Sequence, residues 1–439
     1  MTMPRPRPRH LPHSAWARAS GSAWVPTSVL VCVLSLTPPT AAIAAAPEVS
    51  GDVTVGAWSS TRLLDGRRGI AVARARASLE WQPAQGLAVA AEAWATSAAE
   101  QASADDSRET AGLREAYVQA RSLPCQPALG KRFVAWGKTD AINPTDQISP
   151  ANFKRLVGKD GEQRAGVWGL HLNCAAGPGR LQAHVLSRFK FHAVPFGKTA
   201  GVSISEETPR LRSTSALRYE VLGSAADWSL GWIDGHDLFP TLAVRNVSPQ
   251  GVELVTTATR TRLFGGDLAV ARGAQVYRAE FAWVEHPRND SPLTARRRSY
   301  VQAVAQVENS FAERETLALQ IFGKQLIGSL PSSADPQQDA LQTQVQNAQG
   351  LLSNEVNRRQ IGLTLRYARP LWASRGDIDL FALWAHPQRE WLVRSRVGFE
   401  VDARWRLSAG VDVFRGPTSS YLGNLRPNSL AFVELSYGW

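Results

Sequence analysis

Histidines that could support catalysis occur at two places in this sequence, and neither place supplies a complete catalytic set. His171 and His184 lie on neighbouring alternating segments where both side chains face the polar side, and His236 is followed directly by Asp237. Hydrolysis would need a nucleophile or a carboxylate pair beside such a histidine, and the spacing fixes no partner there. The sequence also contains no HExxH, no glycine-rich phosphate loop and no Cys/His cluster with metal-ligand spacing. We therefore expect no catalytic residue, no metal and no cofactor, and we expect His236 and Asp237 to lie in a solvated loop.

Arginines give a stronger hypothesis, because guanidinium groups that line a pore attract anions and set selectivity. The arginines on the polar faces of alternating segments are Arg74, Arg76, Arg218, Arg278, Arg394, Arg396 and Arg404. The alternative is that neighbouring acids neutralise them in cross-strand pairs. Those acids are Glu80, Glu220, Glu280, Glu400 and Asp402. We favour pairing, because an acid accompanies nearly every arginine.

The segments that carry these arginines alternate apolar and polar residues with the period of two that defines a β-strand. In residues 70–81 and 391–405 one face is apolar and ends in tryptophan, and the opposite face is charged. Soluble β-sandwiches share this alternation. However, segments of about ten residues fit a tilted membrane strand better than the usual ~5–6 residues of soluble sheets. The alternation also continues through the whole chain, with short turns such as 82–86 and 175–179 and longer polar loops.

The last eleven residues, 429–439, carry the most specific signal. Ala431, Val433, Leu435, Tyr437 and Trp439 share one face of an extended strand. A chain that stops on an aromatic residue in this pattern is similar to the C-terminal targeting strand of bacterial outer-membrane barrels, whose aromatic end lies in the interfacial girdle. We expect Leu435, Tyr437 and Trp439 to mediate contact with the barrel-assembly machinery and with outer-membrane lipid.

These patterns predict an all-β fold, a transmembrane antiparallel barrel of about 16–18 strands, which is wide enough to leave an aqueous channel. Both termini are then periplasmic, with short periplasmic turns and long extracellular loops near 99–111, 138–164, 191–212, 286–298, 326–357 and 416–428. Loop 326–357 is rich in Gln, Asn, Ser and Asp. We expect this loop to move freely.

The N-terminus predicts a cleaved signal peptide over residues 1–44, followed by the barrel over 45–439. Its four arginines precede a short apolar stretch and an A-x-A site at Ala42–Ala44. The apolar stretch is too short to cross about 30 Å of hydrocarbon. Because the segment holds no acidic residue, its removal lowers the net charge from +11 to +7. The remaining basic residues are dispersed, which argues against nucleic-acid binding.

Residues 113–156 contain the one region that resembles a known family. The core reads Trp136-Gly137-Lys138-x-Asp140-x-Ile142-Asn143-Pro144-Thr145-Asp146. It is similar to the WGKxDxINPTD signature of a proteobacterial outer-membrane β-barrel family of unknown function, which is distantly similar to alginate-export-type porins. The resemblance implies a periplasmic lipoprotein and an inner-membrane exporter as partners. Cys125 departs from the family pattern, which usually lacks cysteine at that turn.

The same region predicts an ordered loop, 137–157, that folds into the barrel. Asn143-Pro144 sets a turn, and Ser149-Pro150 predicts the start of a short helix that ends near Leu156. Apolar residues in the loop would be poorly placed in open water. We therefore expect Lys138, Asp140, Asn143 and Asp146 at a pore constriction, together with the wall arginines Arg74, Arg76, Arg394 and Arg396. The alternative is a solvated surface loop or an extracellular lid.

Two cysteines, Cys125 and Cys174, remain once Cys32 leaves with the signal peptide. An even number in an oxidising compartment favours a disulfide. The two residues also lie near turns on the same rim of the barrel, joined by one pair of strands. The alternative is two free thiols.

Together these features predict a non-enzymatic channel, porin-like, that passes small solutes or exported cargo across the outer membrane of a Gram-negative cell. The alternative is a barrel that conducts little and docks a periplasmic or inner-membrane export system. An outer-membrane hydrolase is a distant third.

Overall fold

The computed structural model describes residues 46–60, 68–97, 109–156, 163–195, 201–206, 212–287, 291, 293–311, 314–329 and 336–439. The expected signal peptide, residues 1–44, lies outside the described residues, as does residue 157 at the end of the expected inward loop. The fold below is that of the unit Ile43–Trp439. Within the described part of the chain, no helix is both long and apolar enough to cross a membrane.

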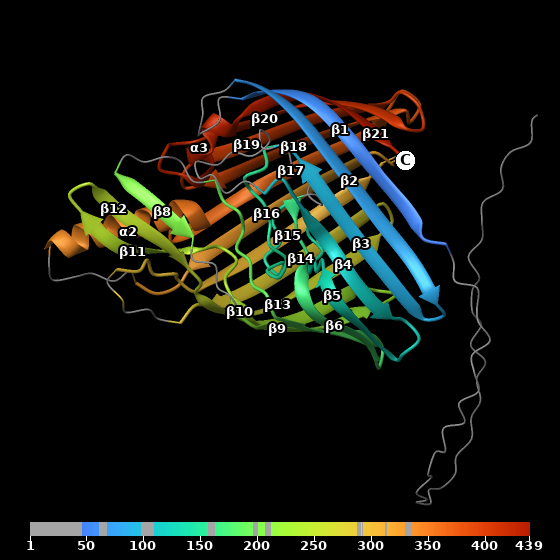
Figure 1. Ribbon diagram of the computed structural model, residues 1–439, viewed down its shortest axis with the longest axis horizontal. Coiled ribbons are helices and arrows are strands. Elements are labelled where there is room, and N and C mark those ends of the chain that lie inside the picture. The colour runs from blue at the N-terminus through green and yellow to red at the C-terminus, as the bar shows by residue number, and fades with distance from the viewer. Residues whose placement is uncertain are drawn as a thin grey trace, which may run out of the picture. The chain divides into compact units, whose positions relative to one another are not determined.

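Eighteen strands form one sheet that closes on itself, because β1 pairs antiparallel with both β2 and the C-terminal strand β21 (Figure 1). The barrel strands are β1 (Glu48–Ser60), β2 (Gly69–Ala84), β3 (Leu87–Thr96), β4 (Ala111–Ala120), β5 (Cys125–Arg132), β6 (Val167–Ala176), β7 (Gly179–Leu186), β9 (Thr214–Leu222), β10 (Asp227–His236), β13 (Arg260–Arg272), β14 (Gln275–Glu285), β15 (Tyr300–Ser310), β16 (Thr316–Leu326), β17 (Arg359–Leu371), β18 (Gly376–His386), β19 (Glu390–Glu400), β20 (Trp405–Arg415) and β21 (Leu430–Gly438). The expected barrel of 16–18 strands is confirmed, at 18.

The two faces of the barrel wall invert the arrangement of a soluble protein. On β16, Leu319 and Ile321 point outward and are 47% and 56% exposed, whereas Gln320 between them points inward and is 2% exposed. The other strands also expose large apolar side chains outside and bury many polar side chains inside, although some inward positions are apolar, such as Phe322 on β16 and Leu263 on β13. A sheet with an apolar outer surface and no edge suits a lipid surrounding, since every backbone group in its strands can pair within the wall.

Short turns and long loops segregate to opposite ends of the barrel, here named the short-turn end and the long-loop end. At the short-turn end, residues 85–86 join β2 to β3 and residues 177–178 join β6 to β7, as expected. Gly86 and Gly177 occupy these turns with φ of 77° and 57°, a region that glycine enters without steric cost.

The expected single strand 391–405 was wrong, because a turn at 401–404 divides it into β19 and β20. The Asp402 carboxylate accepts hydrogen bonds from the backbone N–H groups of Arg404 and Trp405, at 2.8 and 2.9 Å, which closes the turn. Val401 and Trp405 continue the apolar pattern across the turn, so periodicity alone did not reveal it. Arg404 therefore lies in this turn, where it donates to the Tyr437 hydroxyl, and not on an inward strand position.

Three further strands form a separate small sheet beyond the long-loop end. They are β8 (Val202–Glu206), β11 (Thr241–Ser248) and β12 (Gly251–Thr257), and helix α2 (Pro336–Ser353) lies beside them in Figure 1. Leu242, Leu254, Ala295 and Val345 form their shared buried cluster. The expectation that loop 326–357 moves freely was wrong: most of it is α2, and Gln349 is fully buried and accepts from the backbone of Leu242 at 2.8 Å. Residues 337–349 contain no glycine or proline and many glutamines, which are good helix formers.

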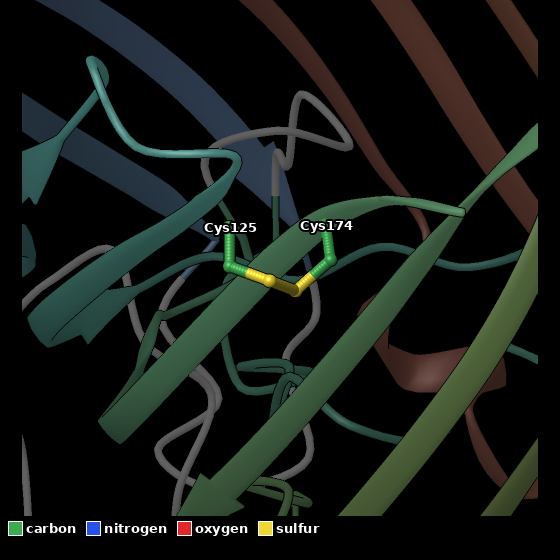
Figure 2. Close-up of a disulfide and its surroundings, with 2 residues drawn as sticks. All are labelled: Cys125 and Cys174. Atoms are coloured by element: carbon green, nitrogen blue, oxygen red, sulfur yellow. A yellow bond between two sulfur atoms is a disulfide. The ribbon is translucent and has the colours of Figure 1, made fainter. Parts of the chain in front are cut away.

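Cys125 and Cys174 are joined by a disulfide near the short-turn end (Figure 2). The two residues are direct partners in the register of β5 and β6. The bond therefore crosslinks two strands that are already neighbours, although the chain between them includes the long connection from residue 133 to residue 166.

Candidate permeation pathway

The connection between β5 and β6 contains residues 137–156, called the inner segment below, and these residues lie against the inner wall. Trp136, directly before it, is 2% exposed and packs in a buried cluster with Ile233, Leu263 and Ala282 of the wall. From there the segment makes hydrogen bonds to inward side chains on β14, β15 and β16.

Glu280 on β14 makes the densest of these contacts. Its Oε1 accepts from the backbone N–H groups of Lys138 and Thr139, both at 2.5 Å, and from the Thr139 hydroxyl at 2.7 Å. Its Oε2 accepts from the Thr145 hydroxyl at 3.2 Å. Four donors from one segment thus converge on one carboxylate that is 3% exposed, and charged acceptors make the stronger class of hydrogen bond.

Two glutamines continue the row along the wall. Gln306 on β15 accepts from the Asp140 backbone N–H at 3.0 Å and donates to the Asp140 carboxylate at 2.6 Å. Gln320 on β16 accepts from the Ile142 N–H at 3.1 Å, and Gln306 and Gln320 are direct register partners. No strand of the described residues pairs with the inner segment here, so side chains of the wall accept from its backbone N–H groups instead.

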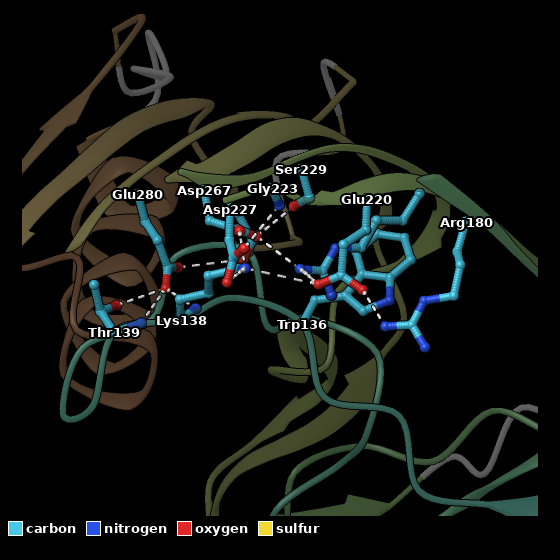
Figure 3. A network of polar contacts seen from close by, with 12 residues as sticks. Trp136, Lys138, Thr139, Arg180, Glu220, Gly223, Asp227, Ser229, Asp267 and Glu280 are labelled. Atoms are coloured by element: carbon cyan, nitrogen blue, oxygen red, sulfur yellow. Dashed lines mark hydrogen bonds and ion pairs between the residues drawn. The ribbon is translucent and has the colours of Figure 1, made fainter. Parts of the chain in front are cut away.

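The Lys138 side chain points away from this row, toward three carboxylates on β9, β10 and β13 (Figure 3). Its Nζ lies 3.8 Å from Glu220, 3.5 Å from Asp227 and 4.0 Å from Asp267. Asp267 also accepts from Arg218 at 2.9 Å. Lys138 is therefore surrounded by carboxylates of the wall and contributes to the packing of the inner segment.

Asn143 and Asp146 hold the turn of the inner segment together. The Asn143 amide donates to the Trp136 carbonyl at 2.8 Å and accepts from Thr145. Arg164 donates to the Asp146 carboxylate. Burial raises the pKa of Asp146, and the hydrogen bond and charge of Arg164 oppose this effect without cancelling it.

The short helix expected after Ser149-Pro150 is absent from the described residues of this region; residues 151 and 152 instead form isolated β-bridges with Arg164 and Ala193. The Ala151 N–H donates to His192 Nδ1 at 2.8 Å, and the Phe153 N–H donates to the Ala193 carbonyl at 2.7 Å. Neighbouring segments thus take the donors and acceptors that a helix would use. The Ser149 hydroxyl accepts from Val134 N–H rather than capping a helix.

A cavity of about 590 Å³ lies between the inner segment and the wall strands β15 to β20. The charged residues that line it are Asp140, Arg155, Arg366, Asp379, Arg394 and Arg396. Its apolar lining includes Phe153, Leu383, Leu392, Phe414 and Leu422. Leu422 belongs to the short helix α3 (Tyr421–Asn424), whose Leu422 N–H donates to Glu390 on β19 at 2.7 Å. The cavity can therefore present both guanidinium groups and apolar surface to a solute.

The wall arginines are matched with acids, as favoured from the sequence, but mostly with different partners. Arg74 pairs with Glu434 at 2.7 Å, Arg76 with Asp52 at 2.8 Å, and Arg278 with Glu308 at 2.9 Å. Arg394 and Arg396 share the fully buried Asp412, at 3.4 and 3.6 Å. Four arginines line the cavity, namely Arg155, Arg366, Arg394 and Arg396. The carboxylates that balance their charge are Asp140 and Asp379 in the lining and the neighbouring Asp412. One positive charge remains in excess.

The eight residues expected at a constriction thus occupy three different environments. Asp140, Arg394 and Arg396 line the cavity. Lys138, Asn143 and Asp146 hold the inner segment in place. Arg74 and Arg76 pair with Glu434 and Asp52, and none of these four residues lines the cavity. The sequence missed Gln306, Gln320 and Arg155, and it assigned Glu280 to a wall arginine instead of to the inner segment. Period-two alternation puts Glu280, Gln306 and Gln320 on the inward face, but no local signal links them to that segment.

The histidines take two different roles. His171 and His184 are register partners on β6 and β7, face inward, and have their Nδ1 atoms 3.0 Å apart. The expectation that Asp237 lies in a solvated loop was wrong. Asp237 is 7% exposed and contacts His286 Nε2 and Arg297, both at 2.7 Å, and Arg297 also contacts Glu355 at 2.8 Å.

These contacts link three connections at the long-loop end: the one after β10, which contains Asp237, the one between β14 and β15, which contains His286 and Arg297, and the one between α2 and β17, which contains Glu355. Burial would raise the pKa of Asp237, but Arg297 and His286 outweigh it and hold that pKa below its usual range. Across the described residues, no three histidines, cysteines or acids come together as a metal site.

No protein-family model matches this chain, and no curated protein matches it. Solved structures with a similar fold include Acinetobacter baumannii OccAB1, with a TM-score of 0.55 and 8% sequence identity over 90% of this chain and 96% of that chain. Pseudomonas aeruginosa OccK3 (OpdO) gives 0.53 and 13% over 90% and 95%, and P. aeruginosa OccK10 (OpdN) gives 0.52 and 14% over 90% and 98%. The chain therefore has the porin-like fold of outer-membrane β-barrels. The family resemblance of the WGKxDxINPTD segment stays a prediction.

Proposed function

We propose that this protein is a channel of the Gram-negative outer membrane that passes small solutes, without catalysis, between the inner segment and the wall. The observation that carries the proposal is the cavity of about 590 Å³, lined by charged side chains, inside a barrel whose outer face is apolar. Polar and charged lining replaces part of the hydration of a passing solute, and the apolar outer face suits hydrocarbon.

The proposed orientation places both termini and the short turns in the periplasm and the long loops outside the cell. The C-terminal strand supports this placement. Tyr437 and Trp439 lie on its outer face, and the Tyr437 ring packs 4.9 Å from Trp405 at the short-turn end. Deleting residues 437–439 should block assembly by the barrel-assembly machinery, and normal surface expression of the truncated chain would contradict this role.

Planar-bilayer recording of the refolded mature protein tests the channel directly. We expect stepwise openings, and we expect larger unit conductance and greater antibiotic sensitivity of cells when residues 139–156 are deleted. A correctly assembled deletion variant with unchanged conductance would contradict a constricting role for the inner segment. A silent bilayer with both proteins would favour the alternative, a barrel that docks an export partner.

A further inference from the structure

The outer face of the barrel carries a polar recess at the long-loop end, outside the lumen. Its volume is about 230 Å³, and it is lined by Ser213, Ser215, Trp232, Asp234, His236 and Arg260, together with Gly235. These residues come from β9, β10 and β13, except for Ser213, which directly precedes β9. None of them contributes to the cavity inside the barrel.

The strand register fixes the depth of this recess. Trp232, Phe264 and Trp283 are consecutive cross-strand neighbours on β10, β13 and β14, and all three side chains point outward, 42%, 47% and 46% exposed. Such an aromatic row marks the boundary between hydrocarbon and headgroups. The next outward row, two residues farther along each strand and so roughly 7 Å away, is Asp234, Arg262 and Glu285. His236 and Arg260 pair in the row after that.

The recess therefore lies at the level of lipid headgroups. The Arg260 and Arg262 side chains are 59% and 57% exposed. Nε and Nη2 of Arg260 donate hydrogen bonds to the Asp234 carboxylate, both at 3.0 Å. The Arg262 guanidinium lies 3.5 Å from Asp234 and 3.8 Å from Glu285. A guanidinium has five N–H donors, so these contacts leave donors available to an anion. Exposed ion pairs are also weak and exchange easily.

His236 adds an independent observation. Its Nδ1 is buried and has no hydrogen-bond partner among the residues that the structure describes, although the side chain lines the recess. Arg212 and Arg260 both act electrostatically on this histidine. A buried polar atom without a partner is costly, and a hydroxyl or phosphate group in the recess would supply one. Three arginines, Arg212, Arg260 and Arg262, and two acids, Asp234 and Glu285, surround the recess, which leaves one positive charge in excess.

We propose that this recess binds a phosphate group of the phosphorylated glycolipid in the outer leaflet, with the acyl chains against the Trp232–Phe264–Trp283 row. A lipid fits better than a soluble anion, because the recess adjoins an exposed aromatic surface that only an amphiphile would cover. The choice of leaflet rests on the proposed orientation. The binding itself does not, because it is measurable on the purified barrel in detergent, and it is independent of conductance.

The experiment titrates the full mature protein, in an uncharged detergent, with diphosphorylated lipid A and with its dephosphorylated form, and counts bound lipid by native mass spectrometry. Wild type should bind the phosphorylated form about tenfold or more tightly, as expected for charge-assisted hydrogen bonds. Arg260→Gln/Arg262→Gln should lose that preference. Arg272→Gln is the matched control, because Arg272 lies outward and exposed at the opposite end of the same strand.

Retention of the preference by Arg260→Gln/Arg262→Gln, or equal loss in Arg272→Gln, would overturn the proposal. Phosphatidylglycerol that binds as tightly as lipid A, or displacement of lipid A by millimolar inorganic phosphate, would also overturn it. If the double variant does not fold, Asp234→Asn/Arg260→Gln removes the ion pair as a unit and should show the same loss of preference. Unchanged bilayer conductance in these variants separates this site from the proposed channel.

Discussion

The Oγ1 atom of Thr139 donates a hydrogen bond of 2.7 Å to Oε1 of Glu280, across 141 residues of sequence. The backbone N–H groups of Lys138 and Thr139 share the same acceptor atom. A single wall carboxylate on β14 therefore determines where the inner segment begins its path along the wall. The width of the proposed pathway depends on this contact, because the cavity lies between that segment and the wall.

Replacing Glu280 should loosen the inner segment without disturbing the barrel. Glu280→Ala removes an acceptor from four donors, and each lost hydrogen bond to a charged group costs about 1.5–3 kcal/mol. We expect noisier and larger unit currents in planar bilayers. Glu308→Gln is the control: Glu308 is an inward carboxylate on neighbouring β15 that pairs with Arg278. Equal currents in Glu280→Ala and wild type would show that other contacts position the segment.

The charge of the cavity should set a weak ion preference. Arg394→Gln/Arg396→Gln removes two of the four arginines, and the fully buried Asp412, left without its cations, takes up a proton, so the excess of one positive charge falls to zero. The reversal potential in a KCl gradient should shift toward cation selectivity. Arg394→Gln/Arg396→Gln/Asp412→Asn should give the same shift, because it has the same net charge at the site. Arg76→Gln, whose arginine pairs with Asp52 outside the cavity lining, should leave the potential unchanged. The same shift in Arg76→Gln would mean that the cavity does not control selectivity.

Period-two alternation predicted the barrel and its inward arginines other than Arg404, because a membrane wall imposes one rule on every strand. It did not reveal the turn at 401–404, where Val401 and Trp405 keep the outward pattern and only Asp402 marks the break. It also did not predict pairing partners. Arg74 pairs with Glu434, which lies on a strand 360 residues away and becomes a neighbour only through closure of the barrel.

The inner segment shows the same limit. Its motif predicted local order, and Asn143 does close the turn onto Trp136. Its acceptors, however, are Glu280, Gln306 and Gln320, which lie 140 to 180 residues later and resemble any inward polar residue. The helix expected after Ser149 failed for a related reason, because His192 and Ala193 compete for its backbone donors. Contacts of this kind depend on tertiary structure, so no pattern in the neighbouring sequence predicts them.

The two faces of β17 provide a matched test of the membrane position. Leu365, in the middle of the strand, points outward and is 46% exposed, whereas Thr364 next to it points inward and lines the cavity. Arginine at Leu365 should destabilise the barrel by about 2–4 kcal/mol, the cost of placing it against lipid near the midplane. Thr364→Arg should cost much less, since the cavity that Thr364 lines admits water. Equal penalties in unfolding titrations in lipid vesicles would contradict the assignment of faces.

His192 should make the inner segment loosen in acid. Its ring is buried between Phe153 and Phe239, with centroids 5.1 and 4.7 Å away, and its Nδ1 accepts from Ala151 N–H, which requires the neutral form. Burial lowers the pKa of His192 to about 3; Asp237 opposes this effect, and Arg164 and Arg297 add to it. When the segment opens, the ring regains its ordinary pKa of about 6.5. Between these values the open state binds one more proton, so the protected state loses stability as pH falls below about 6.5.

The loss is about 1.4 kcal/mol for each pH unit, or roughly 100-fold in the opening equilibrium at two units below 6.5. Hydrogen–deuterium exchange of a peptide covering residues 150–156, corrected for the intrinsic pH dependence of exchange, measures it. His192→Asn keeps a side-chain acceptor for Ala151 but cannot titrate, so its protection should be lower overall and flat between pH 7 and pH 4.5. The same pH slope in His192→Asn and wild type would place the acid sensitivity elsewhere, with the buried contacts of Asp237 as the next group to test.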